Sequence, residues 1–317
     1  MKCRKASHEE WDKIVSNHPE ATFFHSRAWI ELWEKITVRS KATCYIFEDE
    51  NGSSIYLPGL ERKMFKGLVT RFDSGPEGTY GGFLSLDNPT EASIHKVKTF
   101  CKNKFSVYLR QISPDAGGVY NLPAFDTTQI RTLTTNQNPA FLYAKNIQRN
   151  IQKAVSNAIA VQVADHENDW ENYYDLYLQS AKRWSKSTDT LYPISFFIAI
   201  YKNNRIHHKL WLARKNNQII YGCLIFYHGK TAYYWHGCGN DQALETGASS
   251  LLHDQIMADA LLHGCSCYDF MPNGGNANLH RFKSGFGAIE KTVFGYNRKT
   301  RMYTLLENIR GKLTGKY

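Results

Sequence analysis

The chain has 317 residues, of which 42% are hydrophobic, and it carries a formal net charge of +10 at pH 7. This length is enough for two domains with buried cores. The charge favours anionic partners, but no run of five or six like charges occurs, which argues against a dedicated DNA-binding arm and leaves phosphate-bearing small substrates or the acceptor end of a tRNA open.

The seven cysteines are odd in number and show neither a disulfide framework nor repeated zinc spacing, so we expect a reducing compartment and no metal site. Cys265 and Cys267 are expected to be buried thiols. The N-terminus lacks an apolar signal region and no stretch of 18 apolar residues occurs. We therefore expect a cytoplasmic protein without a transmembrane segment.

Local patterns in the first part of the chain predict alternating helices and strands. Ser7 and Glu10 have the spacing of a capping box, which predicts a helix to about residue 16. A second helix follows Ser26. Other expected elements are a hairpin formed by residues 42–48 and 54–57, short strands and loops in the basic and glycine-rich residues 63–84, a helix from a cap at Asn88 to about residue 102, and a strand at 106–112.

After a polar connector at residues 132–139 the pattern restarts. Expected here are helices at 146–157, 167–183, 195–202 and 247–263, short strands at 161–163 and 268–271, a meander at 210–213, 219–227 and 231–237, a short helix near 282, and a basic amphipathic helix in the tail at 298–317. The two parts share one order of elements. We therefore predict an α/β (α+β) fold of two similar units, 1–138 and 139–317, with mixed, mostly antiparallel sheets flanked by helices and a catalytic crevice in the second unit.

Antiparallel strands, a ligand-facing loop, a helix and a further strand form the layout of the N-acetyltransferase (GNAT) superfamily core. The finer pattern is a basic helix at 146–157, the strand Tyr-Tyr-Trp-His-Gly at 233–237, Tyr-Asp-Phe at 268–270 and Phe-Lys-x-x-Phe-Gly at 282–287. It resembles the FemAB/FemX-like transferases. These are tandem GNAT-like proteins that move an amino acid from aminoacyl-tRNA onto the peptide of a peptidoglycan precursor.

The resemblance extends over residues 140–296, and over the first part mainly by architecture. It implies that Arg183 contacts precursor phosphates and that Lys283, after Phe282, lies at the reaction end of the channel. The family lysine four residues after Trp29 is replaced by Trp33. Lys35 or Arg27 could substitute for it.

Acyl transfer to an amine needs donors for an oxyanion and a route for the amine proton. We assign Lys283 to the oxyanion or the donor phosphate, against the alternative of a solvated helix lysine. Tyr234 and His236, two apart on one strand, are expected on one side, where either could relay a proton unless it is simply packed. Asp269 could orient them or bind the amine, or be a capped strand-end carboxylate. The expected substrate-binding residues are Arg183, Arg149, Phe282, Trp235 and Gly247.

A coenzyme A site would need a glycine-rich loop with a basic or amide residue at a helix start. Residues 244–249 read Leu-Glu-Thr-Gly-Ala-Ser, which keeps one glycine and adds a carboxylate. The leading hypothesis is therefore an aminoacyl- or acyltransferase that forms an amide on an amine-bearing cell-envelope precursor, with no cofactor beyond its co-substrate, aminoacyl-tRNA or acyl-coenzyme A. The alternatives are a coenzyme A-dependent N-acyltransferase acting on an amino sugar or other amine, and a non-catalytic module that binds a phosphorylated ligand.

Overall fold

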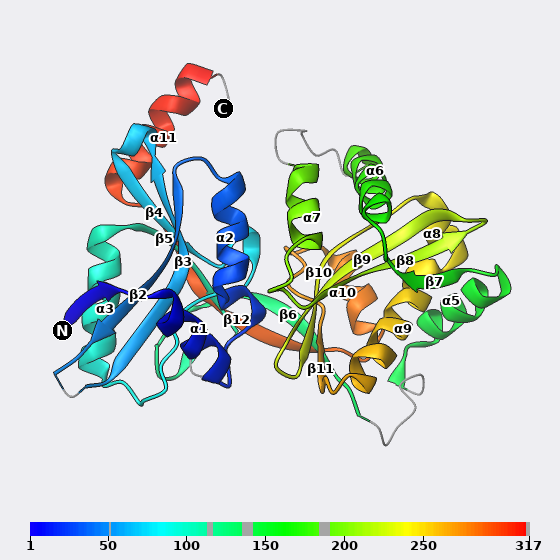
Figure 1. The fold of residues 1–317 in the computed structure, drawn as a ribbon, viewed down its shortest axis with the longest axis horizontal. Coiled ribbons are helices and arrows are strands. Elements are labelled where there is room, and N and C mark those ends of the chain that lie inside the picture. Colours follow the sequence, from blue (N-terminus) through cyan, green and yellow to red (C-terminus); the bar gives the residue numbers. More distant parts are fainter. Residues whose placement is uncertain (51, 113–116, 135–141, 184–190, 315–317) are drawn as a thin grey trace. The chain divides into compact units, whose positions relative to one another are not determined.

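The structure is a computed structural model that describes residues 1–50, 52–112, 117–134, 142–183 and 191–314 (Figure 1). It divides into two compact units. Unit 1 comprises Met1–Asp126 and Thr292–Tyr317, and unit 2 comprises Thr127–Lys291. The chain passes into unit 2 within strand β6 (Ala124–Thr132) and leaves it within strand β12 (Ile289–Arg298).

The division differs from the expected boundary near residue 138, and the C-terminal residues do not belong to the second unit. The reason is long-range pairing: β12 runs antiparallel to β5 (Ser106–Gln111), with Phe294 opposite Gln111. Neither β6 nor β12 was predicted. Pairing of β12 with a strand far away in the sequence returns the end of the chain to unit 1.

Unit 1 contains a mixed sheet in the order β1-β2-β3-β4-β5-β12, in which β4 and β5 are parallel and the other described pairs are antiparallel. Its other strands are β1 (Lys2–Lys5), β2 (Ser40–Glu48), β3 (Ser54–Met64) and β4 (Val69–Ser74). Its described helices are α1 (His8–Asn17), α2 (Arg27–Ile36), α3 (Glu91–Lys104) and α11 (Arg301–Thr314), with the short helices η1 (Phe23–His25), η2 (Phe65–Gly67) and η3 (Pro76–Gly78).

Helices α2 and α3 cover opposite faces of the unit 1 sheet (Figure 1). The expected capping box is confirmed, because Ser7 accepts from the amide of Glu10 and Glu10 accepts from the amide of Ser7. The cap of α3 was placed wrongly at Asn88. Thr90 caps this helix by accepting from the amide of Ser93, two residues further on.

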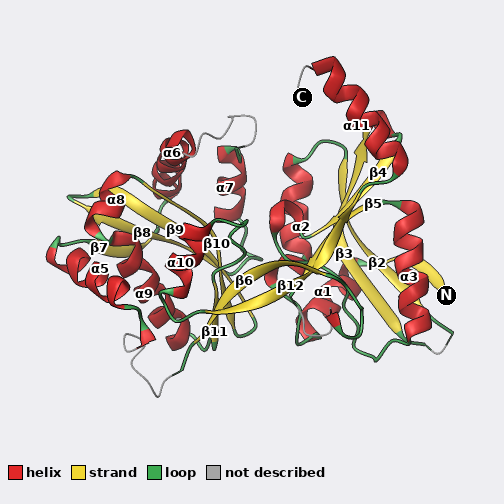
Figure 2. Ribbon diagram, turned by 180° about the vertical axis from the view of Figure 1, so that it is seen from behind, coloured by secondary structure: helices red, strands yellow, loops and turns green. Residues whose placement is uncertain are grey.

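Unit 2 contains a sheet in the order β6-β11-β10-β9-β8-β7, in which only β10 and β11 are parallel among the described pairs (Figure 2). Its other strands are β7 (Ala160–Val163), β8 (His208–Lys215), β9 (Gln218–His228), β10 (Thr231–Gly239) and β11 (Cys267–Asp269). Its described helices are α5 (Lys145–Ser156), α6 (Glu167–Arg183), α7 (Ile194–Tyr201), α8 (Asp241–Thr246), α9 (Ala248–Leu262) and α10 (Ala277–Ser284). Helices α6 and α7 lie on one face, and α5 and α9 lie on the other.

The predicted meander is confirmed as β8, β9 and β10. The helix expected from residue 247 is preceded by the separate helix α8. Gly247 divides the two because its φ of +76° is left-handed, and a β-carbon there would lie 2.3 Å from the carbonyl oxygen of Asn150 on α5. Glycine is therefore the residue that allows α5 to pack against the start of α9.

All seven cysteines are free thiols. The described part of the chain contains no group of three or more histidine, cysteine or acidic side chains placed to hold a metal ion. Among the described helices, none is both long enough and apolar enough to cross a bilayer.

Candidate functional site: a buried lysine in unit 2 and an arginine-containing pocket in unit 1

Lys283 is buried. Helix α10 carries it inward, its residue is 3% exposed, and its Nζ donates to the carbonyl oxygen of Met271 at 2.6 Å. This geometry excludes a solvated surface lysine. An ammonium in a water-poor site interacts strongly with any negative charge that develops beside it. The catalytic role of Lys283 stays a prediction.

Asp269 holds Met271, the residue whose carbonyl accepts a hydrogen bond from Lys283. Met271 has a left-handed φ of +57°, a conformation that costs about 1 kcal/mol or more for a non-glycine residue. Asp269 Oδ1 accepts from the Met271 amide at 2.7 Å and from the Thr128 hydroxyl at 2.9 Å. The carboxylate thus fixes the turn that presents the Met271 carbonyl to Lys283. This arrangement makes Asp269 a positioning residue.

His253, which sequence reasoning missed, lies at the centre of a buried network. Its Nδ1 hydrogen-bonds with the Tyr268 hydroxyl at 2.8 Å, and its Nε2 lies 3.4 Å from the Tyr221 hydroxyl. The Tyr221 hydroxyl in turn lies 3.3 Å from that of Tyr234. Burial, together with the positive charge of Lys283, lowers the pKa of His253 to about 3. The imidazole of His253 is therefore neutral at ordinary pH.

Aromatic rings enclose this imidazole. The rings of Tyr234 and Phe282 lie 4.6 Å and 5.5 Å from that of His253, and those of Phe270 and Phe286 lie within 5.7 Å. Phe282, expected to bind substrate, thus also packs on His253. The available sequence signal for His253 was a single histidine among the mostly apolar residues that α9 buries.

Tyr234 and His236 do not share a face, which corrects the sequence expectation. Tyr234 lies opposite Ile225 on β9 and His236 lies opposite the next residue, Leu224, so Trp235 is the extra residue of a β-bulge. A bulge shifts the alternation of side chains by one position. Tyr234 therefore faces His253 on α9.

His236 faces the other layer of helices. Its Nδ1 hydrogen-bonds with the hydroxyl of Tyr173 on α6 at 2.6 Å, and the ring of Tyr177 lies 4.7 Å away. The bulged Trp235 stacks on Tyr192 at 5.5 Å and also contacts Phe196 of α7. These contacts form an aromatic cluster on this face, separate from the network around His253.

The basic residues expected to bind phosphate do not gather at Lys283. Arg183 donates to Asp241 Oδ1 at 2.7 Å and to the carbonyl of Gly239. Gly239 lies six residues along β10 from Tyr233, the partner of Asp269, or about 20 Å at the rise of a strand. Arg149 is exposed on α5, next to the Asn150 carbonyl that abuts Gly247. Arg183, Arg149 and Gly247 thus belong to the far end of β10 and the start of α9.

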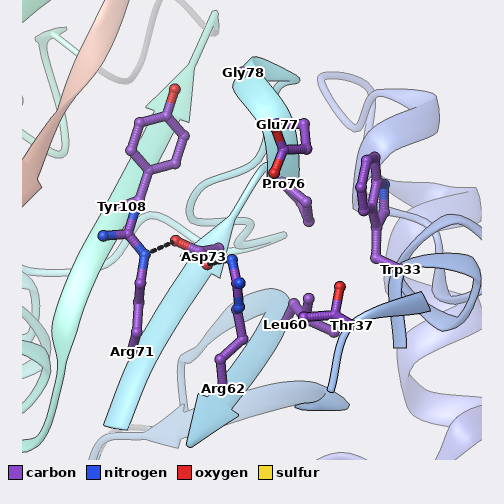
Figure 3. A pocket seen from close by; sticks show the side chains of 10 residues that line it. All are labelled: Trp33, Thr37, Leu60, Arg62, Arg71, Asp73, Pro76, Glu77, Gly78 and Tyr108. Carbon is purple, nitrogen blue, oxygen red and sulfur yellow. Dashed lines mark hydrogen bonds and ion pairs between the residues drawn. The ribbon is translucent and has the colours of Figure 1, made fainter. Parts of the chain in front are cut away.

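Unit 1 contains a pocket of about 280 Å³ lined by charged side chains of both signs and by aromatic side chains (Figure 3). Arg71 Nε donates to Asp73 Oδ1 at 2.6 Å, and Arg62 Nη1 lies 3.4 Å from Asp73 Oδ2. The ring of Tyr108 lies 5.8 Å from the Arg71 guanidinium, and Trp33 lines the same pocket. Two guanidinium groups share the carboxylate of Asp73, and Glu77 lines the same pocket, so its charged side chains are two arginines balanced by two carboxylates.

Arg27 and Lys35, the expected substitutes for the family lysine, are placed elsewhere. Arg27 forms ion pairs with Asp12 at 2.6 Å and Glu31 at 2.9 Å. Lys35 lines a different pocket, which Glu31 also lines. The positive charge beside Trp33 instead comes from β3 and β4. The signal for this pocket was the alternation Arg71-Phe-Asp73, which places Arg71 and Asp73 on one face of a strand.

Residues 143–284 match the family model described as an acetyltransferase (GNAT) domain. The crystal structure of FemX is 14% identical to this chain, covers 97% of it and 100% of its own chain, and has a TM-score of 0.70. The C-terminal domain of a putative lysylphosphatidylglycerol synthetase from Agrobacterium fabrum is 12% identical, with 96% of each chain covered and a TM-score of 0.56. A tandem GNAT protein from the clavulanic acid biosynthesis pathway is 8% identical, with coverage of 94% and 99% and a TM-score of 0.52. A comparison with curated proteins found no match.

These findings identify residues 143–284, which lie within unit 2, as a GNAT-type acyltransferase domain. The predicted fold class is confirmed. The whole chain has the FemX fold, as the resemblance to the FemAB/FemX-like transferases implied. An acyltransferase is thereby supported over a non-catalytic binding module.

Proposed function

We propose that the protein transfers an aminoacyl or acyl group to the amine of an anionic, cell-envelope precursor and so forms an amide. The observation that carries this proposal is the buried ammonium of Lys283 together with the neutral imidazole of His253, inside a GNAT-type domain. Such a pair can stabilise an oxyanion without adding a second positive charge to the site.

In the proposed reaction the acceptor nitrogen attacks the carbonyl carbon of the donor. A C–N bond forms, the bond from carbon to the leaving oxygen or sulfur breaks, and one amine proton ends on the leaving atom. Lys283 donates toward the oxyanion of the tetrahedral intermediate. A histidine with a pKa near 3 is too weak a base to take the amine proton at neutral pH. His253 therefore serves to orient the hydroxyls of Tyr221 and Tyr268, while the Tyr234 hydroxyl can pass the proton.

The pocket of unit 1 supports an anionic acceptor. Arg62 and Arg71 offer guanidinium groups with the geometry that suits phosphate or carboxylate, and Tyr108 and Trp33 offer aromatic surface. The Nε of Arg62 is buried and has no hydrogen-bond partner among the described residues.

The start of α9 supports aminoacyl-tRNA over acyl-coenzyme A as donor. The carbonyl of Asn150 lies against Gly247, and Glu245 is exposed two residues earlier. Both bring negative charge to the position where a pyrophosphate would need donors. The net charge of +10 suits the acceptor end of a tRNA. A tRNA donor would place the reaction in the cytoplasm.

The test is turnover of labelled aminoacyl-tRNA and acyl-coenzyme A with a panel of amine acceptors, in the wild type and in Lys283→Met. Methionine keeps the length of the side chain and removes the ammonium. We expect at least about a 100-fold loss of kcat. Lys291→Met, at an exposed lysine of β12, is the matched control. Unchanged turnover in Lys283→Met would refute the role of Lys283, and consumption of acyl-coenzyme A alone would reassign the donor.

A further inference from the structure

Helix α11 exposes an apolar stripe. Met302, Leu305 and Ile309 are 55%, 57% and 46% exposed, and their spacing of three and four residues places them on one side of the helix. A surface helix of a globular protein usually turns such a stripe toward the core. Here the apolar side is open.

The first turn of α11 is held firmly against unit 1. Tyr303 is 7% exposed and its ring lies 5.3 Å from that of Phe65, at the tip between β3 and β4. Just before the helix, the amide of Thr300 donates to the Ser106 hydroxyl at 3.0 Å. The rest of α11 extends past the β3–β4 end of the unit 1 sheet (Figures 1 and 2). The packing of its first turn therefore fixes the direction in which the stripe faces.

Positive charge accompanies the stripe. Residues 298–312 contain five basic residues (Arg298, Lys299, Arg301, Arg310 and Lys312) and one acidic residue, Glu307, which gives a net charge of +4. At the adjoining tip Lys66 is exposed, and Leu68 is 71% exposed. Apolar side chains flanked by basic ones are what a helix needs to lie in the interface of an anionic bilayer.

We propose that α11 docks unit 1 onto an anionic lipid surface, with the stripe inserted among the headgroups and the basic residues at the phosphates. A second copy of the chain is a poor occupant, because two segments of charge +4 would repel each other. A nucleic acid would use the basic residues and leave the stripe exposed. The inference does not depend on the proposed reaction, because binding is measured without substrates.

The experiment is cosedimentation of the full-length protein with phosphatidylcholine vesicles and with vesicles that also contain phosphatidylglycerol. Binding should require the anionic lipid and weaken with salt. The double variant Leu305→Glu/Ile309→Glu should lower the partition coefficient at least about tenfold, because carboxylates replace inserted side chains. Leu262→Glu, at an 86% exposed leucine at the end of α9, is the matched control and should bind like the wild type.

A second variant, Arg301→Glu/Lys312→Glu, should lose binding to the anionic vesicles by a similar factor while the stripe stays intact. Circular dichroism should be unchanged in all variants, because the substituted side chains are exposed. Equal binding of wild type and stripe variant would overturn the proposal. So would binding to neutral vesicles as strong as to anionic ones, or a dimer in solution that the stripe variant dissociates.

Discussion

The neutral state of His253 makes a quantitative prediction about stability and pH. Its pKa is about 3 in the folded protein against an ordinary value of 6.5, so the folded state resists the proton that the unfolded chain accepts. Its contribution to stability is therefore complete above pH 6.5 and is lost as pH falls toward 3. Between pH 7.5 and 5.5 the loss is about 1.4 kcal/mol, from 1.36 kcal/mol for each pH unit below 6.5.

Replacing His253 by glutamine removes the titrating group and keeps a polar side chain that can pair with Tyr268. We expect His253→Gln to be less stable than the wild type at pH 7.5. On going to pH 5.5, its free energy of unfolding should fall by about 1.4 kcal/mol less than that of the wild type. The free energy of unfolding at each pH is measured by urea unfolding, with hydrogen exchange and mass spectrometry on peptides of α9 as the readout. His263→Gln, at a 54% exposed imidazole just after α9, is the control for replacing a histidine by glutamine. Equal pH dependence in His253→Gln and wild type would refute the reasoning.

Two further predictions concern the start of α9 and the pocket of unit 1. Gly247→Ala should cost at least about 2 kcal/mol in urea unfolding, because its β-carbon would meet the Asn150 carbonyl at 2.3 Å in a left-handed backbone. Gly274→Ala has a φ of +60° but open space around it, so about 1 kcal/mol is expected, and equal costs would contradict the packing argument. In steady-state kinetics Arg62→Ala should raise the KM for an anionic acceptor about tenfold with little change in kcat, whereas Arg27→Ala should leave this KM unchanged. A raised KM in Arg27→Ala together with an unchanged KM in Arg62→Ala would show that the acceptor does not bind in the pocket of unit 1.

The sequence predicted those elements whose signals are local. The capping box at Ser7, the helix Glu167–Arg183 and the meander each depend on residues close together in the chain. Strands β6 and β12 lacked such signals. Their formation depends on partners brought in from elsewhere, such as Gln111 opposite Phe294, and periodicity within a short window does not contain that information.

The site shows the same limit. Phe282-Lys283 could be picked out because a motif lies within a few residues. The environment of Lys283 could not, because the Met271 carbonyl that accepts from it, and the imidazole of His253 on which its charge acts, belong to other elements. The expectation for Tyr234 and His236 failed because one bulged residue, Trp235, breaks the period of two on which it depended.

Each unit holds cationic groups, in environments that suit different tasks. The guanidinium groups of Arg62 and Arg71 line an open pocket, where water and salt weaken each contact and binding can remain reversible. Lys283 is 3% exposed, so its charge acts in a medium of low polarity, where the same interaction is several times stronger. Strong interaction lowers a barrier only if it is directed at charge that develops during the reaction. The turn at Met271 provides that direction. Asp269 accepts from the Met271 amide and so fixes the turn, and the Met271 carbonyl accepts from Lys283 and so orients its amino group.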